Sequence, residues 1–296
     1  MSDSKEILAV GSIAFDTIHT PKGNRDKILG GSSTYFSVAS SRYGTVSLIG
    51  IVGEDFTDSD WKLFKDYNIN IDSVEVCKGD TFSWGGKYNN DYSQRDTLFT
   101  NLGVFENFKP TIKTKYNNPI LYLGNIQPEL QFDVINKVDN PYLIAADSMN
   151  LWIDLFPQDV IELIKKVNIF LLNDEEAMQL TGMTNLEKIA DQFLAYGPEM
   201  VIIKRGGSGS LLAFENKKVN ISVVPHTPVL DPTGAGDSFA GGFLGYISKF
   251  GLDNPINAVV HGTVTASYTV SGFGLEKLCT IKDDDFNNKI KEVKIS

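Results

Sequence analysis

The sequence predicts an α/β protein built on a mostly parallel β-sheet with helices on both faces. Short apolar segments rich in Ile, Val and Leu alternate with helix-length segments over most of the 296 residues, a pattern typical of such sheets. Gly, Pro or Asn bounds these strand-like segments, which are Ile7–Gly11, Val46–Val52, Ile120–Leu123, Tyr142–Ala146, Ile169–Leu172 and Val201–Lys204. The predicted helices are Ser32–Tyr43, Thr57–Tyr67, Pro128–Val138, Leu151–Val167, which contains Pro157, and Leu186–Tyr196.

A second, smaller sheet is predicted where the alternation stops. Residues Thr81–Thr100 are polar and aromatic, and the cluster Asn89-Asn90-Asp91 separates two strand-like runs, as in a hairpin. The sequence has no repeat, low-complexity tract or linker that would divide it. We therefore expect one domain over residues 1–296, with an accessory sheet formed mainly by about 12–30 and 78–103.

Composition excludes several classes of partner. A net charge of -10 and a pI near 4.8 argue against nucleic-acid binding, which needs a basic surface. Apolar runs fall short of the ~20 residues that span a bilayer, so no membrane partner is expected. The start MSDSKEILAV does not resemble a signal peptide. Cys77 and Cys279 are expected to be free thiols in a reducing, cytoplasmic compartment.

The segment Val229–Phe250 gives the strongest indication of chemistry. Beyond Asp237, apolar side chains recur at the spacing of one helix face, at Phe239, Phe243, Ile247 and Phe250. The sequence Gly-Ala-Gly-Asp therefore falls at a helix N-terminus, where unpaired N–H groups and the helix dipole favour an anion. Small side chains allow a phosphate to approach the backbone. We predict an anion hole from the amides of Gly234, Ala235 and Gly236.

Asp237 lies at the edge of this predicted anion hole. A carboxylate there opposes anion binding unless it takes part in the reaction, for instance as the base that accepts a proton from a hydroxyl group attacking phosphorus. The alternative is that Asp237 only caps the helix.

The run DPTGAGDSFAGGF resembles the C-terminal signature of the ribokinase-like (pfkB-type) carbohydrate kinase family. Four further segments resemble the family in order and spacing, so that the resemblance covers nearly the whole chain. They are GSIAFD (Gly11–Asp16), LGGSSTYFSVASSRYG (Leu29–Gly44), NDEEAMQLTG (Asn173–Gly182) and IIKRGGSGSLL (Ile202–Leu212). This resemblance implies a three-layer α/β/α fold with a small β-sheet lid.

The resemblance also implies an ATP-dependent kinase that phosphorylates a hydroxymethyl group of a small sugar by direct in-line transfer, with Asp237 as the general base. Substrate would be bound by Asp16, Gly30, Gly31 and Ser33, and we add Asn125 from its position; the nucleotide would be bound by Asn173, Lys204, Arg205, Gly206, Gly209 and Gly236. Glu176 would hold Mg²⁺ through water, and Asp231 and Thr233 are candidates for a monovalent cation such as K⁺.

Several of these residues have simpler alternative roles. Asp16 could be a turn residue, Gly30 and Gly31 the turn that starts a helix, and Glu176 a first-turn charge that the helix dipole favours. Trp84, Tyr88 and Arg95 match the lid, whose closure would exclude water and whose outer side offers a homodimer contact. Their alternative is an ordinary surface hairpin.

Two departures from the family pattern limit the prediction of substrate. Tyr35 takes the place of the Asn that ribokinases carry, which speaks against ribose. The run DSMNLW lacks the Arg of a DxNxR motif, which makes phosphorylated or acidic sugars less expected. A nucleoside kinase of the same family, with a base stacked on Trp84, is the first alternative. A catalytically silent sugar-binding regulator is the second.

Overall fold

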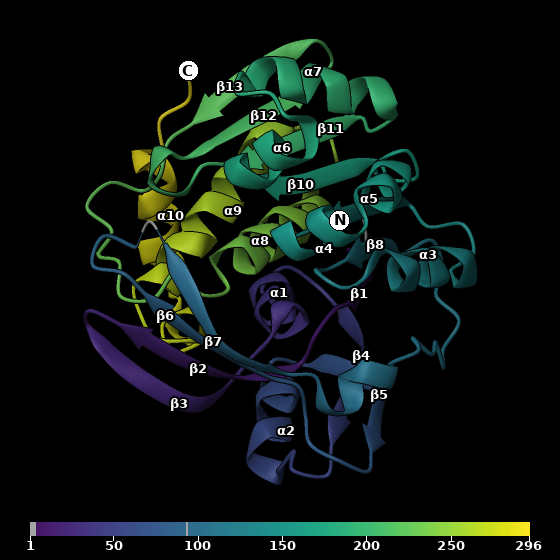
Figure 1. The fold of residues 1–296 in the computed structure, drawn as a ribbon. Coiled ribbons are helices and arrows are strands. Elements are labelled where there is room, and N and C mark those ends of the chain that lie inside the picture. Colours follow the sequence, from purple (N-terminus) through teal and green to yellow (C-terminus); the bar gives the residue numbers. More distant parts are fainter. Residues whose placement is uncertain (1–3, 93) are drawn as a thin grey trace.

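The computed structural model describes residues 4–92 and 94–296, which form one large and one small β-sheet with helices around the large sheet (Figure 1). The large sheet has nine strands in the order β13-β12-β11-β10-β9-β8-β1-β4-β5. Their bounds are β1 Ile7–Val10, β4 Val46–Gly53, β5 Ile69–Cys77, β8 Ile120–Leu123, β9 Leu143–Asp147, β10 Ile169–Asn173, β11 Met200–Lys204, β12 Ser210–Phe214 and β13 Lys217–Ile221.

The predicted α/β class and mostly parallel sheet are confirmed. All neighbouring strands from β5 to β11 pair in parallel, and only β12 and β13 add antiparallel strands at one edge. The strands are continuous apolar runs because both faces of the sheet are buried. In β1, for example, all four residues are fully buried.

Helices cover both faces of the large sheet and give a three-layer architecture. In β1, Ile7 and Ala9 pack into one hydrophobic cluster, and Leu8 and Val10 pack into another on the opposite face. The first cluster is covered by α1 (Ser32–Ser41), α2 (Asp58–Asp66), α8 (Ala235–Phe250), α9 (Pro255–Val270) and α10 (Asp283–Glu292). The second is covered by the 3₁₀ helix η1 (Gly103–Asn107) and by α3 (Pro128–Lys137), α4 (Asn150–Leu155), α5 (Pro157–Ile164), α6 (Asp174–Thr181) and α7 (Leu186–Tyr196).

The prediction of a single helix over Leu151–Val167 is wrong. The chain forms two helices there, and α4 ends one residue before Phe156, which leaves helical geometry at φ -136° and ψ 51°. Pro157 then begins α5, because proline lacks an N–H group and disfavours helical geometry in the residue before it. The sequence analysis also assigned no element to α9 or to the edge strand β5, both of which the structure contains.

The small sheet forms within the two segments predicted for it. Its strands are β2 (Ala14–Thr20), β3 (Gly23–Gly30), β6 (Ser83–Tyr88) and β7 (Arg95–Asn101), in the order β3-β2-β6-β7. Figure 1 places these four strands together, apart from the strands of the large sheet. No helix in the described part of the chain is both long and apolar enough to cross a membrane.

The topology of the large sheet predicts where a ligand binds. The strand β1 lies between β8 and β4, so the chain turns to opposite sides of β1. In open α/β sheets, ligands bind outside the carboxyl ends of the strands at such a point. We therefore expect a ligand site at the carboxyl ends of β8 to β11.

Candidate active site

The carboxyl ends of four parallel strands bring polar side chains to one edge of the sheet. Asn125 follows β8, Asp147 ends β9, Asn173 ends β10 and Lys204 ends β11. Asn173 and Lys204 are paired across β10 and β11. Side chains separated by as many as 79 positions in the sequence thus gather around the edge that the topology selects.

The helix α8 begins at this edge in the way that the sequence predicts. Its first residue is Ala235, and Gly234 precedes it in a left-handed conformation at φ 74°. Within the described part of the chain, the N–H groups of Gly234 and Gly236 donate to no acceptor, as an anion hole requires. The prediction is wrong for Ala235, whose N–H donates to the carbonyl of Pro232 at 3.2 Å because the loop closes into a turn there.

The ring of Tyr35 packs against this turn. An ideal Cβ on Gly234 would lie 2.4 Å from Cγ and Cδ1 of Tyr35, so the glycine rests against the tyrosine ring. The ring is 1% exposed, and its hydroxyl group has no hydrogen-bond partner among the described residues. The residue that departs from the ribokinase pattern therefore contacts the anion-hole loop.

Asp237 lies in the first turn of α8 beside two charged side chains. The pKa of the Asp237 carboxyl is raised to about 7, chiefly by burial and also by the charge of Asp147, while Lys204 opposes the rise. Lys204 Nζ lies 2.6 Å from Oδ2 of Asp147. It also lies 3.2 Å from the place of an ideal Cβ on Gly236, so the ammonium group sits beside the anion-hole turn. Perturbed carboxyl groups near a cation in this way are common at catalytic sites.

Asp16 lies on β2 against the Gly-Gly turn. An ideal Cβ on Gly30 would lie 2.0 Å from Oδ2 of Asp16, so only glycine fits beside this carboxylate. Gly31 has φ 90°, where side chains are disfavoured, and its N–H group bonds the carboxylate. Burial raises the pKa of Asp16 to about 7 despite that bond. The predicted trio of Asp16, Gly30 and Gly31 is thus assembled in space, and their contact with substrate stays a prediction.

Two other predicted substrate residues make bonds within the protein. The hydroxyl group of Ser33 donates to the carbonyl of Ser12 at 2.8 Å, and Ser33 is fully buried, so it fastens the turn that leads into α1. The carbonyl oxygen of Asn125 accepts a bond from Trp152 Nε1 at 3.0 Å, which leaves the amide nitrogen of Asn125 to other partners. Their contact with substrate stays a prediction as well.

Asn173 and Glu176 form a capping box at the start of α6. The Asn173 side chain accepts from the Glu176 N–H group, and the Glu176 carboxylate accepts from the Asn173 N–H group, both at 2.8 Å. The pKa of Glu176 is raised to about 7, chiefly by burial, and Lys204 opposes that rise. Glu176 therefore does take part in capping the start of α6, as its alternative role predicted. The capping bond uses Oε2 of Glu176 and leaves Oε1 for a hydrated cation.

The loop after β11 supplies the remaining predicted nucleotide residues. Arg205 closes the loop through its N–H group, which donates to Gly209 at 2.7 Å, and through its guanidinium, which donates to the carbonyl of Ser210. An ideal Cβ on Gly209 would lie 2.0 Å from the carbonyl oxygen of Ile221, so contact with β13 requires glycine there. Gly206 is exposed and has open space around it.

The candidate cation residues connect two loops. The carboxylate of Asp231 is fully buried and accepts from the N–H groups of Thr233 at 2.9 Å and Gly274 at 3.0 Å. Because both carboxylate oxygens already hold amides, the carboxylate fixes the loop that leads into α8. A monovalent cation here would need further oxygen ligands. No cluster of three or more metal-binding side chains occurs among residues 4–92 and 94–296.

The small sheet faces this site. Tyr88 Oη lies 3.0 Å from Oγ1 of Thr233, and Tyr92 donates to the carbonyl of Leu230 at 3.2 Å, so the end of the β6–β7 hairpin contacts the loop before α8. Trp84 is paired with Asp16 across β6 and β2, which places both side chains on one face. The guanidinium carbon of Arg95 lies 4.9 Å from the centre of the Trp84 ring, and the charge of Arg95 lowers the pKa of Asp16.

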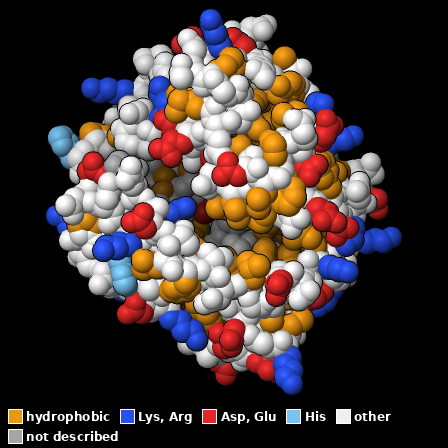
Figure 2. Space-filling view, viewed as in Figure 1, with side chains coloured by type: hydrophobic (Ala, Val, Ile, Leu, Met, Phe, Trp, Pro, Cys, Tyr) orange, Lys and Arg blue, Asp and Glu red, His pale blue; other side chains and the backbone are white. Residues whose placement is uncertain are grey.

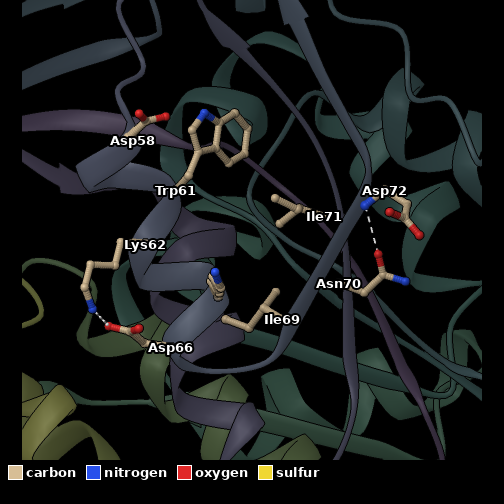
Figure 3. A pocket seen from close by; sticks show the side chains of 9 residues that line it. Asp58, Trp61, Lys62, Asp66, Ile69, Asn70, Ile71 and Asp72 are labelled. Atoms are coloured by element: carbon tan, nitrogen blue, oxygen red, sulfur yellow. Dashed lines mark hydrogen bonds and ion pairs between the residues drawn. The ribbon is translucent and has the colours of Figure 1, made fainter.

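The molecule has a hollowed surface and a separate groove. Figure 2 shows a hollow near the middle of the face in view, with basic and acidic side chains inside it and hydrophobic side chains along its margin. A separate groove of about 680 Å³ lies between α2 and the edge strand β5 and includes Trp61, Ile69 and Ile71 (Figure 3). None of the predicted site residues lines that groove.

The sequence analysis missed Asp147 as a site residue and did not foresee the contact between Tyr35 and Gly234. Asp147 did carry a signal, because an acidic residue directly follows the predicted strand Tyr142–Ala146, as Asn173 follows Ile169–Leu172. Nothing in the sequence indicates that a ring at position 35 meets a glycine at position 234, because that contact depends on packing between α1 and α8.

The chain is similar to known proteins over most of its length. The model of the pfkB family of carbohydrate kinases matches residues 4–280. A nucleoside kinase of Methanocaldococcus jannaschii is 25% identical over 286 residues, 92% of each chain. A cytidine kinase of Thermococcus kodakarensis is 25% identical over 252 residues, 82% of this chain and 89% of the relative.

Solved structures share the fold along the whole chain. The nucleoside kinase of Methanocaldococcus jannaschii superposes with a TM-score of 0.78 at 21% identity, covering 98% of this chain and 99% of that one. A fructokinase variant of Vibrio cholerae, solved with fructose, ADP and a potassium ion, superposes with a TM-score of 0.80 at 17% identity, covering 98% and 100%.

Proposed function

The chain belongs to the pfkB family of carbohydrate kinases and is an ATP-dependent phosphotransferase, and we propose that it phosphorylates the hydroxymethyl group of a nucleoside with Asp237 as the general base. The observation that carries this proposal is the position of Asp237. It lies in the first turn of α8, close to the Lys204 ammonium group and beside the amides of Gly234 and Gly236, which donate to no acceptor among the described residues.

The reaction assigns one task to each of these groups. The hydroxyl oxygen of the acceptor forms a bond to the γ-phosphorus of ATP while the bond from that phosphorus to the β–γ bridging oxygen breaks, which releases ADP. Asp237 accepts the hydroxyl proton, and the Gly234 and Gly236 amides with Lys204 stabilise the negative charge on the transferred group. Loss of water raises the pKa of Asp237 to about 7, so it is a stronger base than an exposed carboxylate.

ATP is expected to bind as its magnesium complex. Glu176 retains a carboxylate oxygen beyond its capping bond, and Mg²⁺ keeps most of its water ligands, so contact through water fits this residue. When bound, Mg²⁺ would neutralise charge on the phosphates. The loop of Arg205, Gly206 and Gly209 and the side chain of Asn173 are the remaining candidates for nucleotide contact. K⁺ near Asp231 and Thr233 and a homodimer through the small sheet stay predictions.

A nucleoside is favoured over a free sugar as acceptor. The two relatives above that match most of both chains are nucleoside kinases by name, whereas sugar kinases such as a Staphylococcus aureus ribokinase match over 39% of this chain. Asp16 offers two oxygens to vicinal hydroxyl groups, and Trp84 on the same face of the small sheet offers an aromatic ring to a base. This reverses the order of the two substrates in the sequence analysis.

The proposal is tested with a panel of acceptors and a coupled assay of ADP release. Cytidine, adenosine and inosine are compared with ribose and fructose at equal concentrations. We expect the highest kcat/KM with a nucleoside. Turnover of free sugars alone would return the sugar assignment, and binding of these compounds without phosphoryl transfer to any of them would favour the silent regulator.

The Trp84→Ala variant locates the base. Stacking of a base on an aromatic ring contributes ~1–3 kcal/mol, so kcat/KM for the best nucleoside should fall about 5- to 100-fold. The rate with ribose, measured on the same variant, is the control because ribose has no base to stack. Equal losses for both acceptors would show that Trp84 only shapes the small sheet.

A further inference from the structure

We propose that Asp147 is a positioning residue, which holds the ammonium group of Lys204 beside the Gly236 turn so that this group contacts the phosphoryl group in transfer. The inference rests on the proposed function and deepens it. The sequence analysis placed Lys204 in a loop along the nucleotide and gave Asp147 no role. The geometry instead directs Lys204 toward α8.

Three distances define the pair. Nζ of Lys204 lies 2.6 Å from Oδ2 of Asp147, within the range of a charge-assisted hydrogen bond. It lies 3.2 Å from an ideal Cβ on Gly236, which places it over the start of α8. Oδ1 of Asp147 accepts the N–H group of Ser148 at 2.9 Å, so the carboxylate is held at both oxygens. The ammonium group is thus fixed on one side by Asp147 and lies beside Gly236 on the other.

The backbone around Asp147 is also fixed. Gln131 is 1% exposed, and its side-chain nitrogen donates to the carbonyl of Asp147 at 3.0 Å and to that of Gly124 at 3.0 Å. This amide fastens the end of β9 to the residue that follows β8. Such support beneath an ion pair is typical of groups that must hold a fixed geometry during a reaction.

Stability alone does not explain this ion pair. The side chains of Lys204 and Asp147 are 17% and 5% exposed, and removing two charges from water costs about as much as their attraction returns. The pair also joins β9 to β11 across β10, three strands that the backbone already pairs. Burial lowers the pKa of Lys204, but the surrounding carboxylates of Asp147, Glu176 and Asp237 outweigh burial and raise the pKa, so they favour the charged form. A cation kept charged beside the Gly236 turn is suited to bind an anion.

If the Lys204 ammonium group contacts the γ-phosphoryl group, it should contribute to the binding of ATP but much less to the binding of ADP. The experiment measures calorimetric dissociation constants of the magnesium complexes of ADP and of β,γ-methylene-ATP. A charge-assisted bond contributes ~1.5–3 kcal/mol, so Lys204→Met should weaken binding of the methylene analogue about 10- to 100-fold and binding of ADP less than about threefold. Asp147→Asn should weaken the analogue about 3- to 10-fold.

The double variant separates positioning from an independent effect. If Asp147 acts through Lys204, then Asp147→Asn has no further effect on the ratio of the two dissociation constants once Lys204→Met is present. The matched controls are Lys218→Met and Asp191→Asn, which break an ion pair of the same 2.6 Å length between β13 and α7. They should leave the ratio unchanged. If Asp147→Asn folds poorly, Asp147→Glu is measured in its place. It keeps the charge, so it should keep part of the ratio of the two dissociation constants.

Each result decides the question. An unchanged ratio in folded Lys204→Met would overturn the contact with the γ-phosphoryl group, and an additive loss in the double variant would overturn the positioning role of Asp147. Lower melting temperature with an unchanged ratio would show a structural pair. These binding data need no acceptor. If the unmodified protein discriminates but phosphorylates nothing in the panel, the proposed function fails while the phosphate contact holds.

Discussion

Replacing Gly234 by Ala tests how closely the anion-hole turn depends on Tyr35. Gly234 has φ 74° and ψ 3°, and an added Cβ would lie 2.4 Å from ring carbons of Tyr35. Gly182 at the end of α6 is the matched control, because its φ of 69° and ψ of 7° are nearly the same and no atom lies within 4 Å of an added Cβ. The two substitutions therefore share the backbone strain and differ in the collision.

The magnitudes follow from these two terms. A side chain in left-handed geometry costs roughly 1–2 kcal/mol, which is the expected loss of unfolding free energy for Gly182→Ala. Gly234→Ala adds an overpacking cost of about 1–3 kcal/mol, because a buried aromatic ring must move. Movement of the turn by about 1 Å should also lower kcat/KM about 10²-fold, whereas Gly182→Ala should keep it.

Urea unfolding and the coupled kinase assay measure both effects. Tyr35→Ala removes the ring carbons, so in that background Gly234→Ala should cost no more than Gly182→Ala does in the unmodified chain. Equal costs for Gly234→Ala and Gly182→Ala in the unmodified chain would refute the collision. Full activity of Gly234→Ala would refute the dependence of the anion hole on this turn.

Four further predictions concern the carboxyl groups. Asp237→Asn should lower kcat about 10²- to 10⁴-fold with binding of the methylene analogue changed less than about threefold, and a near-full rate would exclude Asp237 as the base. Asp16→Asn should raise KM for the acceptor and leave KM for ATP unchanged; the opposite pattern in steady-state kinetics would reverse that assignment. Because Asp237 must be ionised to accept a proton and its pKa is about 7, kcat/KM should decrease as the pH is lowered below about 7. A kcat/KM that is independent of pH from about 5.5 to 8 would contradict this. The pKa values of Asp16, Glu176 and Asp237 are each raised to about 7 in the fold, so the folded state binds more protons than the unfolded state between about pH 4 and 7. Stability without ligand should therefore decrease as pH rises through that window, which the urea midpoint at about pH 5 and pH 8 can check.

The sequence predicted the parts of the fold that depend on local patterns. Short apolar runs alternating with helix-length segments identified the parallel sheet, and the Gly-Ala-Gly-Asp turn identified the start of α8, because apolar composition and glycine preference act over a few residues. It failed at Pro157, where a long periodic pattern hid a break between α4 and α5. It assigned nothing to α9, whose Val and Thr residues favour strands but which buries ten of its residues against α8 and its surroundings.

The site divides in the same way. Asp237 could be named from the sequence because it follows a recognisable turn, and Glu176 because its segment resembles a family motif. The ring of Tyr35 beneath Gly234 and the bond between Asp147 and Lys204 could not, because 57 residues separate the last two and only the pairing of β9, β10 and β11 brings them together. The amino-acid sequence determined which side chains are available for phosphoryl transfer, and the packing of the sheet against α1 and α8 decided which of them meet.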